Sequence, residues 1–109
     1  MKKIKIAVPS NDGQTIFHGM LGRAARFSIY ELDREKRKIT FLEVRPNPYE
    51  KTLQHEKTRD VYTLMDDCSM ILSEKIGRQG RQWLRKRNVH LIFANGDILT
   101  ALQKAIKDV

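Results

Sequence analysis

The chain has 109 residues, 40% of them apolar, which is enough for one domain over residues 1–109 and too little for two. No apolar run reaches the ~18 residues that cross a bilayer, and a single cysteine excludes an internal disulfide and favours a reducing, cytoplasmic setting. The formal net charge of +8 predicts attraction to anions such as nucleic acid, small charged ligands or an anionic metal cluster, although the same excess also serves solubility.

The first half of the chain predicts a three-stranded meander. Apolar residues alternate with other residues over 4–9, which is the period of a strand. Residues 26–32 and 38–45 predict two further strands around a charged turn at 33–37, and such a pair forms an antiparallel hairpin. Residues 10–25 show no period, and a loop of this length in a small domain often has a function.

The second half predicts helices that alternate with strands. In chain order the pattern indicates helix 55–67, strand 69–72, helix 78–87, strand 90–94 and a last helix that begins after Asn95-Gly96-Asp97. The first of these helices places Val61, Leu64, Met65 and Cys68 on one face. The order βββαβαβα predicts an α/β fold in three layers, with helices packed on a mixed five-stranded sheet.

Three polar segments are expected to meet at one edge of this sheet. Gly77 and Asn95-Gly96 follow two strands of the parallel type, and the loop 10–25 follows the first strand. Open α/β sheets bind ligands at the carboxyl ends of their parallel strands. Backbone N–H groups at helix starts favour anions there, so the sequence predicts an anion-binding site at this edge.

Several short motifs, taken in order, resemble one protein family. They are Ile-Ala-Val-Pro-Ser-Asn-Asp-Gly at 6–13, Leu-Gly-Arg-Ala-Ala-Arg-Phe at 21–27, Arg-Pro-Asn-Pro at 45–48, Glu-Lys-Ile-Gly at 74–77, Asn-Val-His-Leu at 88–91 and Asn-Gly-Asp at 95–97. Together they resemble the dinitrogenase iron–molybdenum cofactor biosynthesis family, the accessory factors of nitrogenase cofactor assembly in nitrogen fixation. The resemblance implies a ribonuclease H-like fold. It also implies a carrier of an iron–sulfur or iron–molybdenum cluster precursor, with proteins of cofactor assembly as partners.

The resemblance also directs attention to particular residues. Cluster-handling members carry a histidine where this chain has Met20, and His18 lies two places earlier; the histidine that opens the first helix is His55 here. Imidazole nitrogen suits iron and iron–sulfur species, so His18 and His55 are the candidate metal ligands and Met20 is an auxiliary one. The full set of candidate cargo-binding residues is His18, Met20, Gly22, Arg23, His55, Gly77, Arg78, Asn95 and Gly96. Cys68 is expected to be buried and inert.

The sequence also bears on three other functions. A ribonuclease H-like nuclease needs a carboxylate in its first strand, and strand 4–9 has none, so we expect no enzymatic activity. Asp66-Asp67 reads as a solvated helix end. The alternative function is a basic module that binds nucleic acid or a phosphate ligand. Its phosphate contacts would be Arg78, Arg81, Arg85, Lys86 and Arg87, together with Arg34, Lys36, Arg37 and Lys38. A third is an interaction protein, monomer or homodimer, that pairs through its edge strands.

Overall fold

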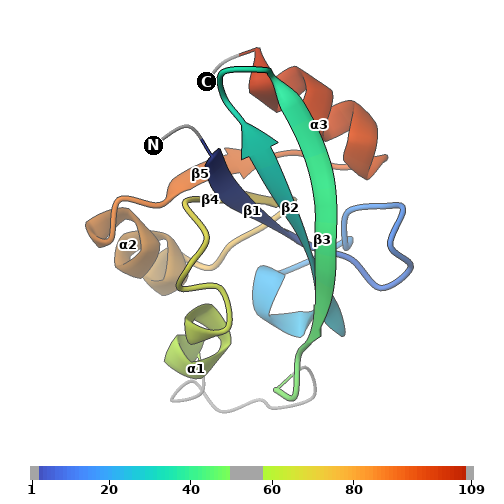
Figure 1. Ribbon diagram of the computed structural model, residues 1–109. Helices are drawn as coiled ribbons and strands as arrows, with labels where there is room; N and C mark the ends of the chain where they lie inside the picture. The colour runs from blue at the N-terminus through green and yellow to red at the C-terminus, as the bar shows by residue number, and fades with distance from the viewer. Residues whose placement is uncertain (1–2, 50–57, 108–109) are drawn as a thin grey trace.

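The structure is a computed structural model that describes residues 3–49 and 58–107. In chain order the described residues form β1 (Lys3–Pro9), β2 (Arg26–Asp33), β3 (Lys38–Pro46), α1 (Thr58–Thr63), β4 (Met70–Ser73), α2 (Arg78–Lys86), β5 (His90–Phe93) and α3 (Ile98–Ile106) (Figure 1). The predicted order βββαβαβα is confirmed.

The five strands form one mixed sheet in the order β3-β2-β1-β4-β5. β1 pairs antiparallel with β2 and parallel with β4, while β2 with β3 is antiparallel and β4 with β5 is parallel. The meander and the crossovers predicted from the two halves of the sequence therefore meet at β1. The carboxyl ends of β1, β4 and β5 consequently lie at the same edge of the sheet.

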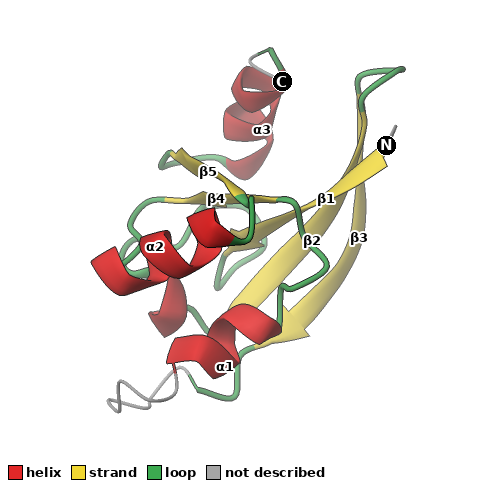
Figure 2. Ribbon diagram, turned by 90° about the vertical axis from the view of Figure 1, so that its left-hand side faces the viewer, coloured by secondary structure: helices red, strands yellow, loops and turns green. Residues whose placement is uncertain are grey.

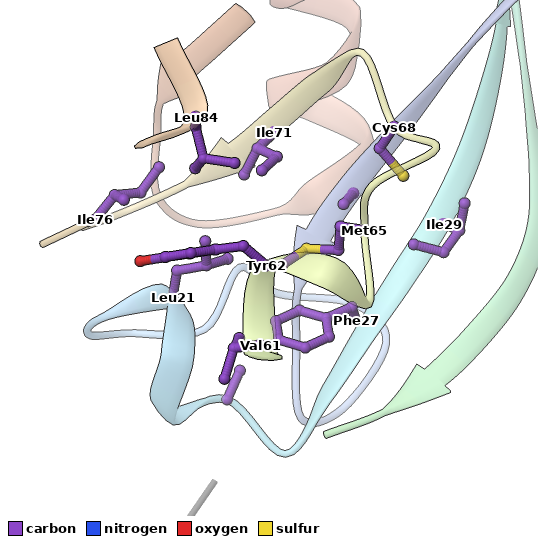
Figure 3. Packing of buried hydrophobic residues seen from close by; sticks show 12 residues of the cluster. Leu21, Phe27, Ile29, Val61, Tyr62, Met65, Cys68, Ile71, Ile76 and Leu84 are labelled. Carbon is purple, nitrogen blue, oxygen red and sulfur yellow. The ribbon is translucent and has the colours of Figure 1, made fainter. Parts of the chain in front are cut away.

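Helices cover both faces of the sheet, which gives three layers (Figure 2). α1 and α2 pack on one face, over side chains that include Phe27, Ile29 and Ile71, all fully buried (Figure 3). α3 packs on the other face, where Ile6 and Leu72 are buried. Burial on both faces explains why the inner strands are rich in branched apolar residues.

The first helix is shorter than predicted. α1 ends at Thr63, and the expected residues 55–57 lie outside the described part of the chain. Beyond the helix the backbone tightens, because Leu64 and Met65 donate their N–H groups to carbonyls three residues earlier, Val61 and Tyr62. These turns place Cys68 in the core although it is not helical. The apolar spacing therefore predicted correctly that Cys68 is buried, but it was wrong that the helix extends to residue 67.

Cys68 is buried, as expected. Burial raises the pKa of its thiol to about 12, because the apolar surroundings disfavour the thiolate. It lies at the amino end of β4, since the N–H of the next residue, Ser69, donates to the carbonyl of Lys5. That is the edge of the sheet opposite the converging loops.

Asp67 is not the freely solvated residue that the sequence suggested. Its carboxylate accepts hydrogen bonds from both terminal nitrogens of Arg45, at 2.7 and 2.9 Å, and from Lys5 Nζ at 3.0 Å. Arg45 also donates to the carbonyl of Leu64 at 2.8 Å. The turn after α1 is thus tied to β1 and β3, and the Arg45 guanidinium holds the pKa of Asp67 well below its usual range.

A close approach of two helices depends on Gly80. A Cβ atom on Gly80 would overlap the ring and hydroxyl of Tyr62, which belongs to α1. The Tyr62 ring stacks on Trp83, with centroids 5.6 Å apart, and the Arg87 guanidinium carbon lies 3.6 Å from the centroid of Trp83. α1 and α2 therefore pack through a continuous stack of planar groups.

Gly80→Ala is expected to destabilise the protein, although alanine normally favours a helix interior by about 1 kcal/mol over glycine. The new methyl group displaces Tyr62, and such overpacking costs roughly 1–3 kcal/mol. Urea unfolding measures the loss, with exposed Gln82→Ala as the control on the same helix. A more stable Gly80→Ala variant would contradict this packing.

Asp67→Asn is expected to lower the free energy of unfolding at pH 7 by roughly 1 kcal/mol, because the carboxylate is more than a third exposed and its ion pairs are partly screened. A carboxyl whose folded-state pKa is lowered stabilises above its unfolded pKa of about 4 and loses that contribution as pH falls through the folded value. The difference between wild type and variant should therefore shrink below about pH 4. A constant difference down to pH 2 in acid-unfolding curves would show that the ion pairs are not its source.

Candidate functional site

The long loop after β1 contacts the two segments that follow β4 and β5. Ile16 donates its backbone N–H to the carbonyl of Gly96 at 2.8 Å, and Leu21 donates to that of Lys75 at 2.9 Å. Isolated bridges join Thr15 to Asp97 and Met20 to Lys75. The structure thus brings together the three segments that the sequence placed at one edge.

The first part of this loop is held by one carboxylate. Asp12 accepts hydrogen bonds from the backbone N–H groups of Gln14 and Thr15, at 2.9 and 2.8 Å, and from the hydroxyls of Thr15 and Ser10. The backbone bond from Thr15 contributes most to lowering the pKa of Asp12 far below its usual value. Asp12 is therefore a hydrogen-bond acceptor that shapes the loop.

A buried amide fixes the second part of the loop. The side chain of Asn47, which follows β3, donates to the carbonyls of Gly22 and Ala24 at 3.0 and 2.8 Å. Only 4% of Asn47 is exposed. Asn47 was not predicted as a site residue, although an asparagine enclosed by two prolines was the available signal. It sets the 3₁₀ turn at Leu21–Arg23, and so the position of Gly22 and Arg23.

His18 is the most exposed candidate ligand, and it has one defined partner. Its Nδ1 lies 2.6 Å from Glu74 Oε2, and 92% of the His18 side chain is exposed against 12% of Glu74. An ionised carboxylate only accepts hydrogen bonds, so Nδ1 carries the proton and donates. In the neutral imidazole the other ring nitrogen, Nε2, then carries no proton and can bind a metal, which is the arrangement by which carboxylates orient metal-binding histidines.

Met20 lies beside the start of α2. Its methyl carbon would be 3.2 Å from a Cβ atom built on Gly77, and 40% of Met20 is exposed. Gly19, between His18 and Met20, has φ +145°, which side-chain-bearing residues rarely adopt. A Cβ on Gly19 would also approach the ring of Phe17 to 3.1 Å. The glycine therefore permits the turn that presents His18 and Met20 on this edge.

The two helix starts at this edge differ in their capping. α2 begins after Gly77 with no side chain that caps it and with no acidic residue in its first turn. α3 begins after Asp97, whose carboxylate accepts from the N–H and the hydroxyl of Thr100 at 2.9 Å each. A carboxylate already occupies the anion position of α3, so the start of α2 is the more open of the two to an external anion.

The predicted site residues are thus only partly brought together. His18, Met20 and Gly77 lie on adjoining segments. Arg23 and Arg78 are exposed and follow Met20 and Gly77 closely in sequence. Asn95 and Gly96 precede α3, whose start is already capped by Asp97. His55 lies outside the described residues. Within the described ranges, no three His, Cys, Asp or Glu side chains gather in a way that could hold a metal ion. Glu74, which positions His18, was not predicted as a site residue.

Comparison with known proteins decides the family. The family model described as dinitrogenase iron-molybdenum cofactor matches residues 2–108. The chain belongs to this family. No protein of curated function matches the sequence.

Solved structures agree on the fold. The apo form of the orange protein from Desulfovibrio gigas is similar with a TM-score of 0.72 at 17% identity, covering 95% of this chain and 88% of that one. A Methanocaldococcus jannaschii protein provisionally described as a dinitrogenase gives 0.70 at 14% identity, with 99% and 92% covered. A Thermotoga protein provisionally described as NifB gives 0.63 at 19% identity, with 96% and 88% covered. The α/β architecture is therefore the ribonuclease H-like fold that the family resemblance implied.

The helices of the described residues are too short to span a membrane. None of those formed by residues 58–63, 78–86 and 98–106 has the length and apolar character that a bilayer crossing requires.

Glu74 is expected to fix the tautomer of His18. Long-range ¹⁵N–¹H correlation spectra at a pH where the imidazole is neutral should show Nδ1 protonated and Nε2 bare in the wild type. Glu74→Ala should return His18 to the free-histidine preference, in which the Nε2–H form prevails, because the acceptor for Nδ1–H is lost. His90, exposed at the start of β5, serves as the internal reference, and unchanged His18 shifts in the variant would show that Glu74 does not hold the ring.

Proposed function

We propose that this protein is a non-catalytic carrier that binds an iron–sulfur-type cluster, or a related anionic metal cargo, at the edge formed by loop 10–25 and the start of α2. The observation that carries the proposal is the hydrogen bond from His18 Nδ1 to Glu74, because it leaves Nε2 free and oriented on an exposed loop. Membership of the family is established, and the cargo and its protein ligand His18 are what we propose in addition.

A single histidine suits a carrier better than a resident metal site. A transported cluster keeps most of its own sulfide or external ligands and must be released, so one or two protein ligands are sufficient. Met20 supplies a soft thioether beside Gly77. His55 remains the second candidate ligand from the sequence, and the variant His55→Ala measures its contribution to cargo binding separately.

Positive charge at the same edge supports an anionic cargo. Arg23 and Arg78 are exposed, Lys75 pairs by backbone with loop 10–25, and the first turn of α2 offers N–H groups that no side chain caps. Cations and helix N-termini together stabilise a negative ligand more than either does alone. The absence of a carboxylate from β1 supports the non-catalytic part of the proposal, because metal-dependent nucleases of this fold type need one there.

Anaerobic incubation with iron and sulfide, followed by visible absorption and iron analysis, tests this function. The wild type is expected to gain charge-transfer absorption and bound iron. His18→Ala should lose most of both, since it removes the ligand, and Glu74→Ala should weaken binding by roughly tenfold, since it removes only the orienting acceptor.

His90→Ala is the matched control, because His90 is exposed at the amino end of β5, away from the loop edge. It should bind like the wild type. A colourless, iron-free wild-type protein would overturn the proposal, and so would a spectrum that neither His18→Ala nor His55→Ala alters.

A further inference from the structure

The positive charge of this chain is concentrated in one segment. Between Glu74 and Asp97 there is no acidic residue, and the Lys and Arg residues there are Lys75, Arg78, Arg81, Arg85, Lys86 and Arg87. These cations equal three quarters of the formal net charge of +8. The positive charge is therefore concentrated on α2 and the residues beside it. Five of the six cations lie on or directly after this one helix.

These cations are available to an external partner. Arg78, Arg85, Lys86 and Arg87 are exposed, and Arg81 is half-buried. The ion pairs between described side chains involve Lys3, Lys5, His18 and Arg45, and none of them includes a cation of the α2 segment. Like charges at helical spacing repel each other, so this row of cations along α2 destabilises the helix unless an anion neutralises it.

The side chains exposed on α2 favour a polyanion over a protein as the binding partner. Stable protein interfaces have an apolar core, but the exposed large apolar side chains in the described part of the chain are Met20, Phe41, Leu42, Val44, Phe93 and Leu99, and α2 contributes none of them. Trp83, its largest side chain, is half-buried between Tyr62 and Arg87. A row of exposed guanidinium and ammonium groups without an apolar centre suits a phosphate backbone.

One exposed aromatic ring lies on the same face of the sheet. Phe93 is paired in register with Ser73, as Leu91 is with Ile71, and Leu91 and Ile71 both pack in the core beneath α1 and α2. Phe93 therefore faces the α2 side, and 47% of it is exposed. Phe93 is the last residue of β5, so its ring lies toward the edge of the sheet where α2 begins. An exposed ring on the same face as a row of cations is the combination that lets unpaired bases stack while their phosphates are neutralised.

We propose that the α2 face binds single-stranded nucleic acid, with the phosphates on Arg85, Lys86 and the neighbouring cations and a base on Phe93. This binding does not require the cargo proposed above. The cluster ligand His18 lies on loop 10–25, whereas Arg85 and Lys86 lie in the last turn of α2. The iron-free protein is therefore the form to test.

Fluorescence anisotropy of a labelled, mixed-sequence single-stranded DNA, titrated with iron-free protein between about 50 and 200 mM salt, measures the interaction. Neutralising about four phosphates predicts a log–log salt slope near −3. Arg85→Gln/Lys86→Gln should bind more weakly and reduce the slope by about 1.4, because two contacts are lost. Phe93→Ala should weaken binding roughly tenfold with the slope unchanged, because stacking is not ionic.

Arg34→Gln/Lys36→Gln is the matched control, since it removes two exposed charges from the turn between β2 and β3 and gives the same net charge. It should bind like the wild type, and both double variants should melt within a few degrees of it, as changes at exposed positions usually do. Equal weakening by the two double variants would overturn the assignment to α2, since it would mean that only net charge matters. Equally effective competition by polyglutamate would assign the face to acidic proteins instead, and no binding at about 50 mM salt would remove it altogether.

Discussion

The fold is organised by the position of β1 between an antiparallel and a parallel neighbour. Its antiparallel partner β2 begins where loop 10–25 ends, so the chain leaves β1 at one edge of the sheet and returns from that edge. Its parallel partner β4 ends at the same edge, and β5 ends beside β4. The register of this one strand therefore decides which loops can meet, and a slip by one residue would also turn Ile6 and Val8 away from the core under α3.

Given that register, the chemistry at the edge follows from how the long loop is restrained. A loop of sixteen residues carries a large conformational entropy, which its hydrogen bonds must offset. Asp12, within the loop, and Asn47, which follows β3, bond four of its backbone groups, and the bridges to Lys75 and Asp97 fasten it to the two junctions. A restrained loop presents His18 in one orientation, and pre-organisation of this kind improves affinity by reducing the entropy lost on binding.

The sequence predicted the parts of this arrangement that depend on local pattern. Alternation and helical period identify the elements, and the residue types after each strand identify the edge. Asn88 follows the cap Arg87, and its φ of +62° is the left-handed conformation that terminates α2. Relations between distant residues were not predictable, because neither the pairing of Glu74 with His18 nor that of Asp67 with Arg45 leaves a periodic signal. Asp67 therefore looked like a solvated residue at a helix end.

The short α1 illustrates the same limit at the level of packing. Val61, Met65 and Cys68 have helical spacing and all are buried, yet only Val61 is helical, because tight turns can also return side chains to one core at intervals of three or four residues. What holds the segment after Val61 is tertiary: the Asp67 network on one side and the Tyr62–Trp83 stack on the other. Gly80, which permits that stack, could not be distinguished in the sequence from a glycine of an anion-binding loop.

The two proposed surfaces share α2, and this has a consequence for how they would act together. The helix begins with uncapped N–H groups and Arg78 at the cargo edge and ends with Arg85, Lys86 and Arg87. Nine residues at 1.5 Å per residue span about 13 Å, which exceeds the screening length of about 8 Å at physiological ionic strength. A negative cargo at one end would therefore weaken the attraction of phosphates near the middle of the helix more than at its far end. Because coupling between two binding events is reciprocal, nucleic acid on this helix would weaken cargo binding by the same factor, so the two anions would disfavour each other without any change of shape.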